Sequence, residues 1–320
     1  PPVRQESDLR LTIDACRELG LKWIRYQESW ANRESAEDVF NWSPMDRRIT
    51  LLHQAGIRIL LTLGGHQWPQ WLNSTGAHDE DAVLAQFREY VRTLLNRYAG
   101  KIDRIQFGNE WNWEIDDYFA GNEAAYVRYN NILYQEVKRV PKELRPTVVL
   151  GSLNGLAYLA FDQGLVDSII VEGEEPYVER IKEYQANPDR ALTIRAEYVL
   201  ARAHYDMLDI HLYDDYRNWP YYLEALLALE RRVKQGNHPV LVSEFGGPYP
   251  VSLYRFFGGK PKEDLLAHRL ASYLHTLDSM ELQEVYFFSL AEGGDERYHQ
   301  DSYLITSAGA KTVAYEVMRR

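Results

Sequence analysis

The sequence predicts an α/β protein of the (β/α)8 TIM barrel class. Short, continuously apolar segments alternate with amphipathic segments along most of the chain. This alternation is typical of a parallel sheet covered by helices. A doubly wound sheet would gather its polar strand-end residues at one switch point, whereas a barrel distributes them around one face. Polar residues follow many of the predicted strands, namely Arg25, His66, Glu110, His211, Glu244 and Glu292.

Helices are expected where apolar residues recur at helical spacing between a capping residue and a terminating glycine. The segment 43–56 has Ser43 as a candidate N-cap, Pro44 at the first helical position and Gly56 as the stop. The predicted helices span about 7–20, 43–56, 79–99, 122–140, 162–172, 175–186, 190–205, 219–235, 262–280 and 309–319.

The apolar segments between these helices give seven strands, where a closed barrel needs eight. We therefore expect the first barrel strand to be absent or to lie upstream of Pro1, because the chain opens on a helix. No repeat or linker divides the sequence, so a single catalytic domain is expected over residues 1–320. The predicted strands are 21–26, 57–65, 102–108, 147–152, 207–213, 239–245 and 284–290.

Composition excludes several classes of partner. The formal net charge is −11, and an acidic protein repels phosphate backbones, so nucleic acid is not expected as a partner. No apolar run approaches the ~18 residues of a membrane span, and no signal peptide is visible. The single Cys16 excludes an intrachain disulfide and is expected to be buried and inert in the first helix.

Two glutamates end apolar strands in similar settings. Glu110 closes "IQFGNE" and Glu244 stands in "VLVSEFGG". Their strands are three apart in the predicted order, so in a barrel the two side chains would converge above the core. Glycoside hydrolysis needs such a pair, with one carboxyl group protonated and the other ionised, and close carboxyl groups raise one another's pKa. The alternative is two ordinary strand-end glutamates in salt bridges.

Longer motifs make the family resemblance specific. In its order of motifs the chain resembles the retaining glycoside hydrolases with a (β/α)8 barrel whose catalytic glutamates follow strands four and seven, of the xylosidase/iduronidase-like or cellulase-like families. The resemblance covers nearly the whole chain. It rests on "GLKWIRYQESWANRE", "FNWSPMDRRITLLHQAGIRILLTLGG", "QFGNEWN", "LDIHLY", "LVSEFG" and "DSYLITSAGAKTVAYEVMR".

This resemblance implies hydrolysis by double displacement through a glycosyl-enzyme intermediate. Glu110 would be the acid/base and Glu244 the nucleophile. Asn109 would hydrogen-bond the sugar 2-hydroxyl, Arg25 would hold Glu244 ionised, and Tyr213 would orient it. Arg25 has an alternative in a surface pair with Glu28.

Other site candidates are implied with less definite roles. His66 and His211 would contact sugar hydroxyls or support the glutamates, or else serve as structural histidines. The family places a Trp after its last strand, where "VYFFSLAEGGD" has none, so Glu292 is a candidate pocket residue. Trp30, Trp68 and Trp111 follow strands and are candidates for sugar platforms or for core packing.

Two other function classes remain open. A metal-dependent sugar isomerase barrel would draw ligands from Asp209, His211, Asp214, Asp215 and Glu244. A non-catalytic carbohydrate-binding barrel would bind a sugar at the same strand ends without cleaving it. The favoured interpretation needs no cofactor and no metal. It takes an oligo- or polysaccharide as its partner, and it weakly favours an extracellular or periplasmic location.

Overall fold

The computed structural model describes residues 6–65, 68–74, 81–112, 121–165, 170, 175–188, 190–213, 215–246, 262–292 and 302–319. The chain divides into two compact units. The four-stranded unit consists of Leu21–Asn154 and Arg195–Asp209, and the three-stranded unit consists of Pro1–Gly20, Gly155–Ile194 and Ile210–Arg320. A single domain over residues 1–320 stays a prediction, as does the first strand, since residues 1–5 lie outside the described residues.

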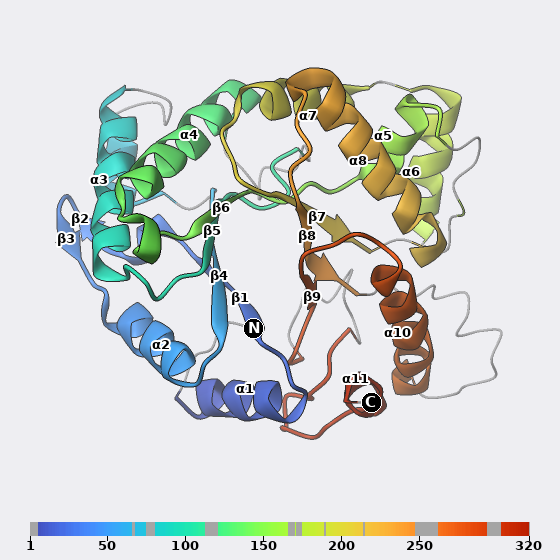
Figure 1. Cartoon of the computed structure of the whole chain (residues 1–320), viewed down its shortest axis with the longest axis horizontal. Coiled ribbons are helices and arrows are strands. Elements are labelled where there is room, and N and C mark those ends of the chain that lie inside the picture. Colours follow the sequence, from blue (N-terminus) through green and yellow to red (C-terminus); the bar gives the residue numbers. More distant parts are fainter. Residues whose placement is uncertain are drawn as a thin grey trace. The chain divides into compact units, whose positions relative to one another are not determined.

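The four-stranded unit is built on a parallel sheet. In this sheet Thr62 lies opposite Gln106, and Gln106 opposite Val149, while Met207 bridges Val149 in parallel beyond the last strand. Helices cover the outer side of the strands (Figure 1). The strands, in spatial order, are β1 (Trp23–Glu28), β4 (Arg58–Leu63), β5 (Arg104–Phe107) and β6 (Thr147–Leu150). The helices are α2 (Ser43–Gln54), α3 (Asp81–Arg97) and α4 (Glu123–Arg139).

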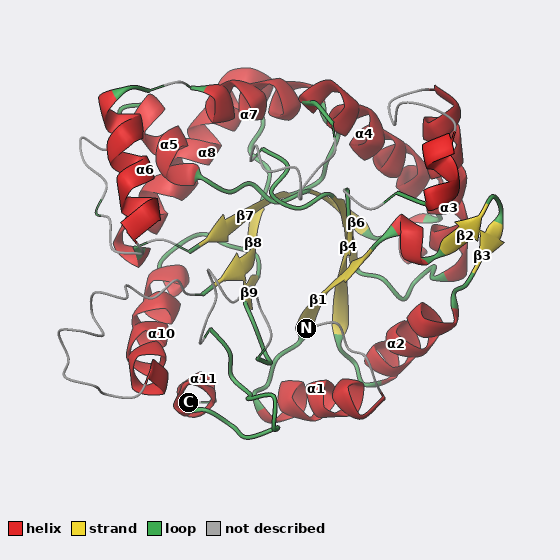
Figure 2. Ribbon diagram, turned by 180° about the vertical axis from the view of Figure 1, so that it is seen from behind, coloured by secondary structure: helices red, strands yellow, loops and turns green. Residues whose placement is uncertain are grey.

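The three-stranded unit carries the remaining strands of the predicted set. Helix α8 packs against α5, α5 packs against α6, and α10 packs against α11 (Figure 2). The strands are β7 (Leu208–Leu212), β8 (Val240–Phe245) and β9 (Val285–Phe287), with β8 and β9 parallel. The boundary between the units falls within β7 and within α7. The helices are α1 (Glu6–Glu18), α5 (Leu156–Asp162), α6 (Glu175–Ala186), α7 (Ala191–Arg202), α8 (Trp219–Lys234), α10 (Lys262–Asp278) and α11 (Val313–Met318).

All seven predicted strands are present, but three local expectations differ from the structure. The helix expected at 162–172 does not begin at Asp162, because α5 ends there and Gly164 adopts a φ of 65° that breaks the helix, and residues 166–169 and 171–172 lie outside the described residues. Ser43 is the first residue of α2 rather than its cap, and Asn41 Oδ1 accepts its N–H at 3.3 Å. The antiparallel hairpin of β2 (Glu34–Ala36) and β3 (Val39–Phe40) was not expected, since strands this short carry no periodic pattern.

Part of the aromatic excess in the sequence is core of the four-stranded unit. Trp30 stacks on Tyr90 with ring centroids 5.6 Å apart, and Phe107 stacks on Tyr129 at 5.3 Å. Phe87 contacts Trp30, Tyr90, Phe107 and Tyr129, so these five rings form one cluster. Aromatic side chains bury large apolar areas, so the cluster ties the loop after β1 to α3, β5 and α4.

Cys16 lies in α1 with its side chain buried, as expected. Burial raises the pKa of its thiol to about 11, so the reactive thiolate is scarce near neutral pH. Among the described residues, no helix combines the length and apolar composition needed to cross a bilayer.

The ends of β5 and β6 approach closely at Gly151. A Cβ atom added there would lie 2.3 Å from the Phe107 carbonyl oxygen, 2.6 Å from the Tyr126 hydroxyl and 2.9 Å from the Gly108 carbonyl oxygen. No side chain fits in that space, so the close contact of the two chain segments depends on glycine.

We expect Gly151→Ala to destabilise the protein by about 3 kcal/mol, because the methyl group must displace backbone atoms. Gly20→Ala is the matched control. Gly20 has a φ of 69° but an added Cβ would meet nothing within 4 Å, so only backbone strain of about 1 kcal/mol is expected. Urea unfolding followed by circular dichroism measures both. Equal losses for the two variants would contradict the close approach at Gly151.

Candidate active site

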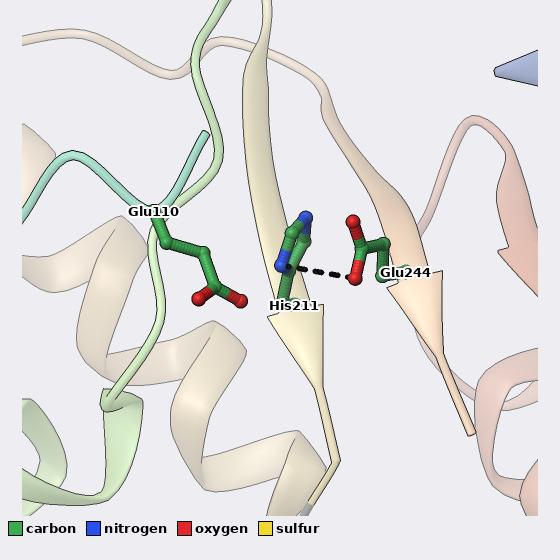
Figure 3. A group of neighbouring side chains, drawn as sticks. All are labelled: Glu110, His211 and Glu244. Atoms are coloured by element: carbon green, nitrogen blue, oxygen red, sulfur yellow. Dashed lines mark ion pairs between the residues drawn. The ribbon is translucent and has the colours of Figure 1, made fainter. Parts of the chain in front are cut away.

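Glu110 lies three residues beyond the end of β5, on a turn (Figure 3). Gly108, with a φ of 78°, turns the chain where an added Cβ would meet Tyr126 Cε2 at 2.8 Å. Glu110 itself has a φ of 44°, which is uncommon for a residue with a side chain. Its backbone N–H donates to Ser152 Oγ at 3.1 Å, and only 5% of the residue is exposed. The turn therefore fixes Glu110 at the carboxyl end of the sheet.

Asn109 is held by Arg25. Arg25 Nη2 donates to Asn109 Oδ1 at 2.5 Å, and Arg25 Nε donates to Thr62 Oγ1 at 2.9 Å. The alternative was a surface ion pair between Arg25 and Glu28. Glu28 is instead buried, and its Oε1 lies 3.2 Å from Arg33 Nε. Arg25 therefore holds the side chain of Asn109 in place. That it also keeps Glu244 ionised stays a prediction.

Glu244 lies near the end of β8 in the three-stranded unit. The Tyr213 hydroxyl donates to its Oε2. His211 Nδ1 lies 3.6 Å from the same oxygen (Figure 3). His211 Nε2 is 3.0 Å from the hydroxyl of Ser243, the residue before Glu244. Hydrogen bonds and a nearby imidazole stabilise a carboxylate anion. Tyr213 and His211 therefore both lie beside Glu244, and their roles in a reaction stay predictions.

Two of the candidate sugar platforms lie in the interior. Trp30 is 2% exposed, within the aromatic cluster, and its Nε1 donates to Glu34 Oε2 at 2.5 Å. Trp111 is 3% exposed, stacks on Tyr126 at 4.8 Å, and donates from Nε1 to the Gly151 carbonyl at 2.6 Å. A ring whose faces are covered offers no surface to a sugar, so core packing is the correct interpretation for both.

The remaining candidates have more open surroundings or lie outside the described residues. Trp68 is half-buried and packs on Tyr129 at 4.8 Å. Glu292 is partly exposed, and the Ser307 N–H donates to its carboxylate at 2.6 Å, which lowers its pKa. His66 lies outside the described residues.

The metal-dependent isomerase alternative needs several side-chain ligands, and one of its candidates, Asp215, is already paired. Asp215 accepts Arg217 Nε at 2.7 Å on Oδ1 and binds the same guanidinium through Oδ2, so its carboxylate is already engaged. Asp214 lies outside the described residues. Histidine and glutamate are side chains that bind divalent metals. A histidine beside a glutamate can equally stabilise the carboxylate without any metal.

Two serines with site contacts were not predicted. Ser152 ends "TVVLGS" and touches the turn of Glu110, and Ser243 precedes Glu244. Their positions at strand ends were a usable signal, but a serine there has many ordinary roles, so nothing in the sequence singled them out.

Comparisons with known proteins agree on the fold. Residues 1–80 match the model of glycoside hydrolase family 42, described as beta-galactosidase. No curated protein matches the chain. Similar solved structures include the exo-beta-1,4-mannosidase Op5Man5 from Opitutaceae bacterium strain TAV5, with a TM-score of 0.65, 16% identity and coverage of 98% of this chain and 55% of that one.

Two further structures extend the comparison. A glucosidase from Croceicoccus marinus has a TM-score of 0.67, 14% identity and coverage of 96% and 62%. A GH5_18 protein from Bifidobacterium longum subsp. longum ATCC 55813, in complex with Manb1-4GlcNAc, has a TM-score of 0.68, 14% identity and coverage of 99% and 73%. The chain spans less than two thirds of the mannosidase and the glucosidase. The chain therefore has the fold of the (β/α)8 barrel glycosidases, which confirms the predicted fold class.

Proposed function

We propose that the protein is a retaining glycoside hydrolase, with Glu110 as acid/base and Glu244 as nucleophile. The observation that carries this proposal is the support given to Glu244 by Tyr213 and His211 at the end of β8. In the barrel fold, a second glutamate after a strand three places away stands near enough to act on the same bond. Glu110 is buried and follows β5, three strands before β8 in the chain, so it is our candidate for this second glutamate.

The chemistry divides into two steps. In the first, the Glu244 carboxylate attacks the anomeric carbon while the Glu110 carboxylic acid gives its proton to the leaving glycosidic oxygen. In the second, the Glu110 carboxylate takes a proton from a water molecule, which attacks the anomeric carbon and frees Glu244. This mechanism requires carboxyl groups about 5–5.5 Å apart. Interception of the intermediate by a sugar instead of water would give transglycosylation.

The surroundings of Glu244 suit a nucleophile. A hydroxyl and an imidazole hold the carboxylate in one orientation and stabilise its charge. The Tyr213 hydroxyl can weaken its hydrogen bond as the carboxylate oxygen becomes an ester oxygen. Such contacts position the attacking oxygen before the reaction begins.

For the substrate we propose a β-linked oligosaccharide. The similar structures are named as a mannosidase and a glucosidase, and one was solved with Manb1-4GlcNAc. Trp30 and Trp111 lie in the interior, and among the described residues the half-buried Trp68 and Trp71 are candidates for stacking on a sugar ring. A panel of 4-nitrophenyl β-glycosides of galactose, mannose, glucose and xylose would identify the sugar.

Glu244→Gln is expected to abolish glycosyl-enzyme formation, because an amide oxygen is a poor nucleophile. The wild-type protein, treated with the 2,4-dinitrophenyl 2-deoxy-2-fluoro glycoside of its preferred sugar, should gain one fluoroglycosyl group on the peptide that contains Glu244. Mass spectrometry measures this. Glu18→Gln, at an exposed carboxylate on α1, is the matched control and should label normally. Labelling of another residue would contradict the assignment.

Glu110→Ala is expected to slow glycosides with poor leaving groups by about 10²–10⁴-fold, the usual contribution of general acid catalysis. Activated aryl glycosides need no proton on departure, so their glycosylation step should change far less. Steady-state kinetics with a series of phenols of different pKa tests this. Equal slowing across the series would rule out the acid role.

Tyr213→Phe removes the hydroxyl that donates to Glu244 and should lower kcat/KM about tenfold or more, the value of one hydrogen bond to a charged group. The control is Tyr26→Phe, which removes a comparable tyrosine bond to the Glu28 carboxylate in the other unit. Activity unchanged in Tyr213→Phe, or equally reduced in both variants, would mean that Tyr213 does not orient the nucleophile.

A further inference from the structure

We propose that Ser152 is a positioning residue for the acid/base, through a single hydroxyl that fixes both the backbone of Glu110 and the side-chain amide of Asn109. This inference rests on the proposed function, because it gives Ser152 a task only if Glu110 and Asn109 act on a sugar.

The turn that carries Glu110 is bonded along its length to the segment that follows β6. Three consecutive residues of the turn contact residues of the segment 151–154. The contacts join Glu110 N to Ser152 Oγ at 3.1 Å, Trp111 Nε1 to the Gly151 carbonyl at 2.6 Å, Asn112 Nδ2 to the Asn154 carbonyl at 2.7 Å, and Asn154 N to Asn112 Oδ1 at 3.0 Å.

Ser152 is the member of this set that bears directly on Glu110. The left-handed φ of 44° costs Glu110 free energy, of the order of 1 kcal/mol, that the surrounding structure must offset. Ser152 is 0% exposed and Glu110 is 5% exposed. Water therefore has little access to replace the hydroxyl as acceptor of the Glu110 N–H, and an unpaired buried N–H is costly.

The same hydroxyl sets the orientation of the Asn109 amide. Arginine has only donors, so the Asn109 atom that faces Arg25 at 2.5 Å must be the carbonyl oxygen. Ser152 Oγ lies 3.4 Å from that oxygen and its one proton is available to donate to it, because its lone pair accepts the Glu110 N–H. The hydroxyl is thus donor and acceptor at once.

This orientation leaves the Asn109 amide nitrogen for a ligand. No described residue accepts a hydrogen bond from Nδ2, and Asn109 is only partly buried. A fixed NH2 group can donate to the sugar 2-hydroxyl, the contact proposed for Asn109. Ser152 would therefore act on the reaction through Asn109 and Glu110 without touching the substrate.

The test compares Ser152→Ala with the wild type on two probes, the 4-nitrophenyl glycoside cleaved in the panel and its 2-deoxy counterpart. The ratio of kcat/KM for the two probes should fall about tenfold or more in the variant, since only the first probe uses the Asn109 contact. Ser152→Cys, which refills the space with a weak donor, should move the ratio in the same direction. An unchanged ratio in both variants overturns the proposal.

The matched control is Ser302→Ala. Ser302 is also a buried serine, and its hydroxyl donates to the Phe288 carbonyl at 2.6 Å in the three-stranded unit. Its removal should lower stability without changing the ratio between the two probes. A comparable fall of the ratio in Ser302→Ala would show that any lost buried hydroxyl has this effect, and it would overturn the specific role of Ser152.

A second readout needs no activity. Hydrogen exchange of the Glu110 amide, measured by NMR, should be about tenfold faster or more in Ser152→Ala and unchanged in Ser302→Ala. Unchanged protection would overturn the bond to Ser152 as a restraint. If the wild type cleaves no glycoside of the panel while the exchange result holds, the proposed function fails and the restraint on Glu110 stands.

Discussion

The close approach of the Gly151 backbone to the carbonyl groups of Phe107 and Gly108 is the constraint on which the site region of the four-stranded unit depends. It brings the residues after β6 within reach of the turn after β5. The Trp111 ring can then bond the Gly151 carbonyl, and Ser152 can accept the N–H of Glu110. A side chain at position 151 would separate the two segments and remove both contacts. The glycine therefore acts on the candidate acid/base through the backbone, without contacting it.

The buried carboxylate of Glu136 and the partly buried carboxylate of Glu244 have different kinds of partner. Burial alone would raise the pKa of Glu136, but Arg88 and Arg92 bond it and lower that pKa below its ordinary value. Two guanidinium groups make such a carboxylate a fixed anion between helices. Glu244 is instead supported by a tyrosine hydroxyl and an imidazole. Both partners contact the same oxygen, Oε2, and together they fix the direction of the carboxylate.

The fold was predictable from the sequence because its signals are local. Continuous apolar strands and amphipathic helices follow from the buried faces that a parallel sheet requires, and all seven strands are found where such segments occur. The errors also have local causes. Helix α5 (Leu156–Asp162) was not among the predicted helices, because a short buried helix shows no polar face, and β2 and β3 are too short to show a period. Trp30 and Trp111 were ambiguous, since an aromatic residue after a strand suits a sugar platform and a core equally.

The sequence by itself determined the order of the strands along the chain and the positions of Glu110 and Glu244 at strand ends. Those features depend on residue type and spacing within one segment. The role of Tyr213 beside Glu244 was implied only by the family resemblance, because the two residues are 31 positions apart in the chain. Only the tertiary structure decided that Arg25 holds Asn109, that Ser152 bonds the turn of Glu110, and that two tryptophans are interior. The first two contacts join residues 84 and 42 positions apart, and the third depends on which ring faces are covered, so no local pattern encodes them.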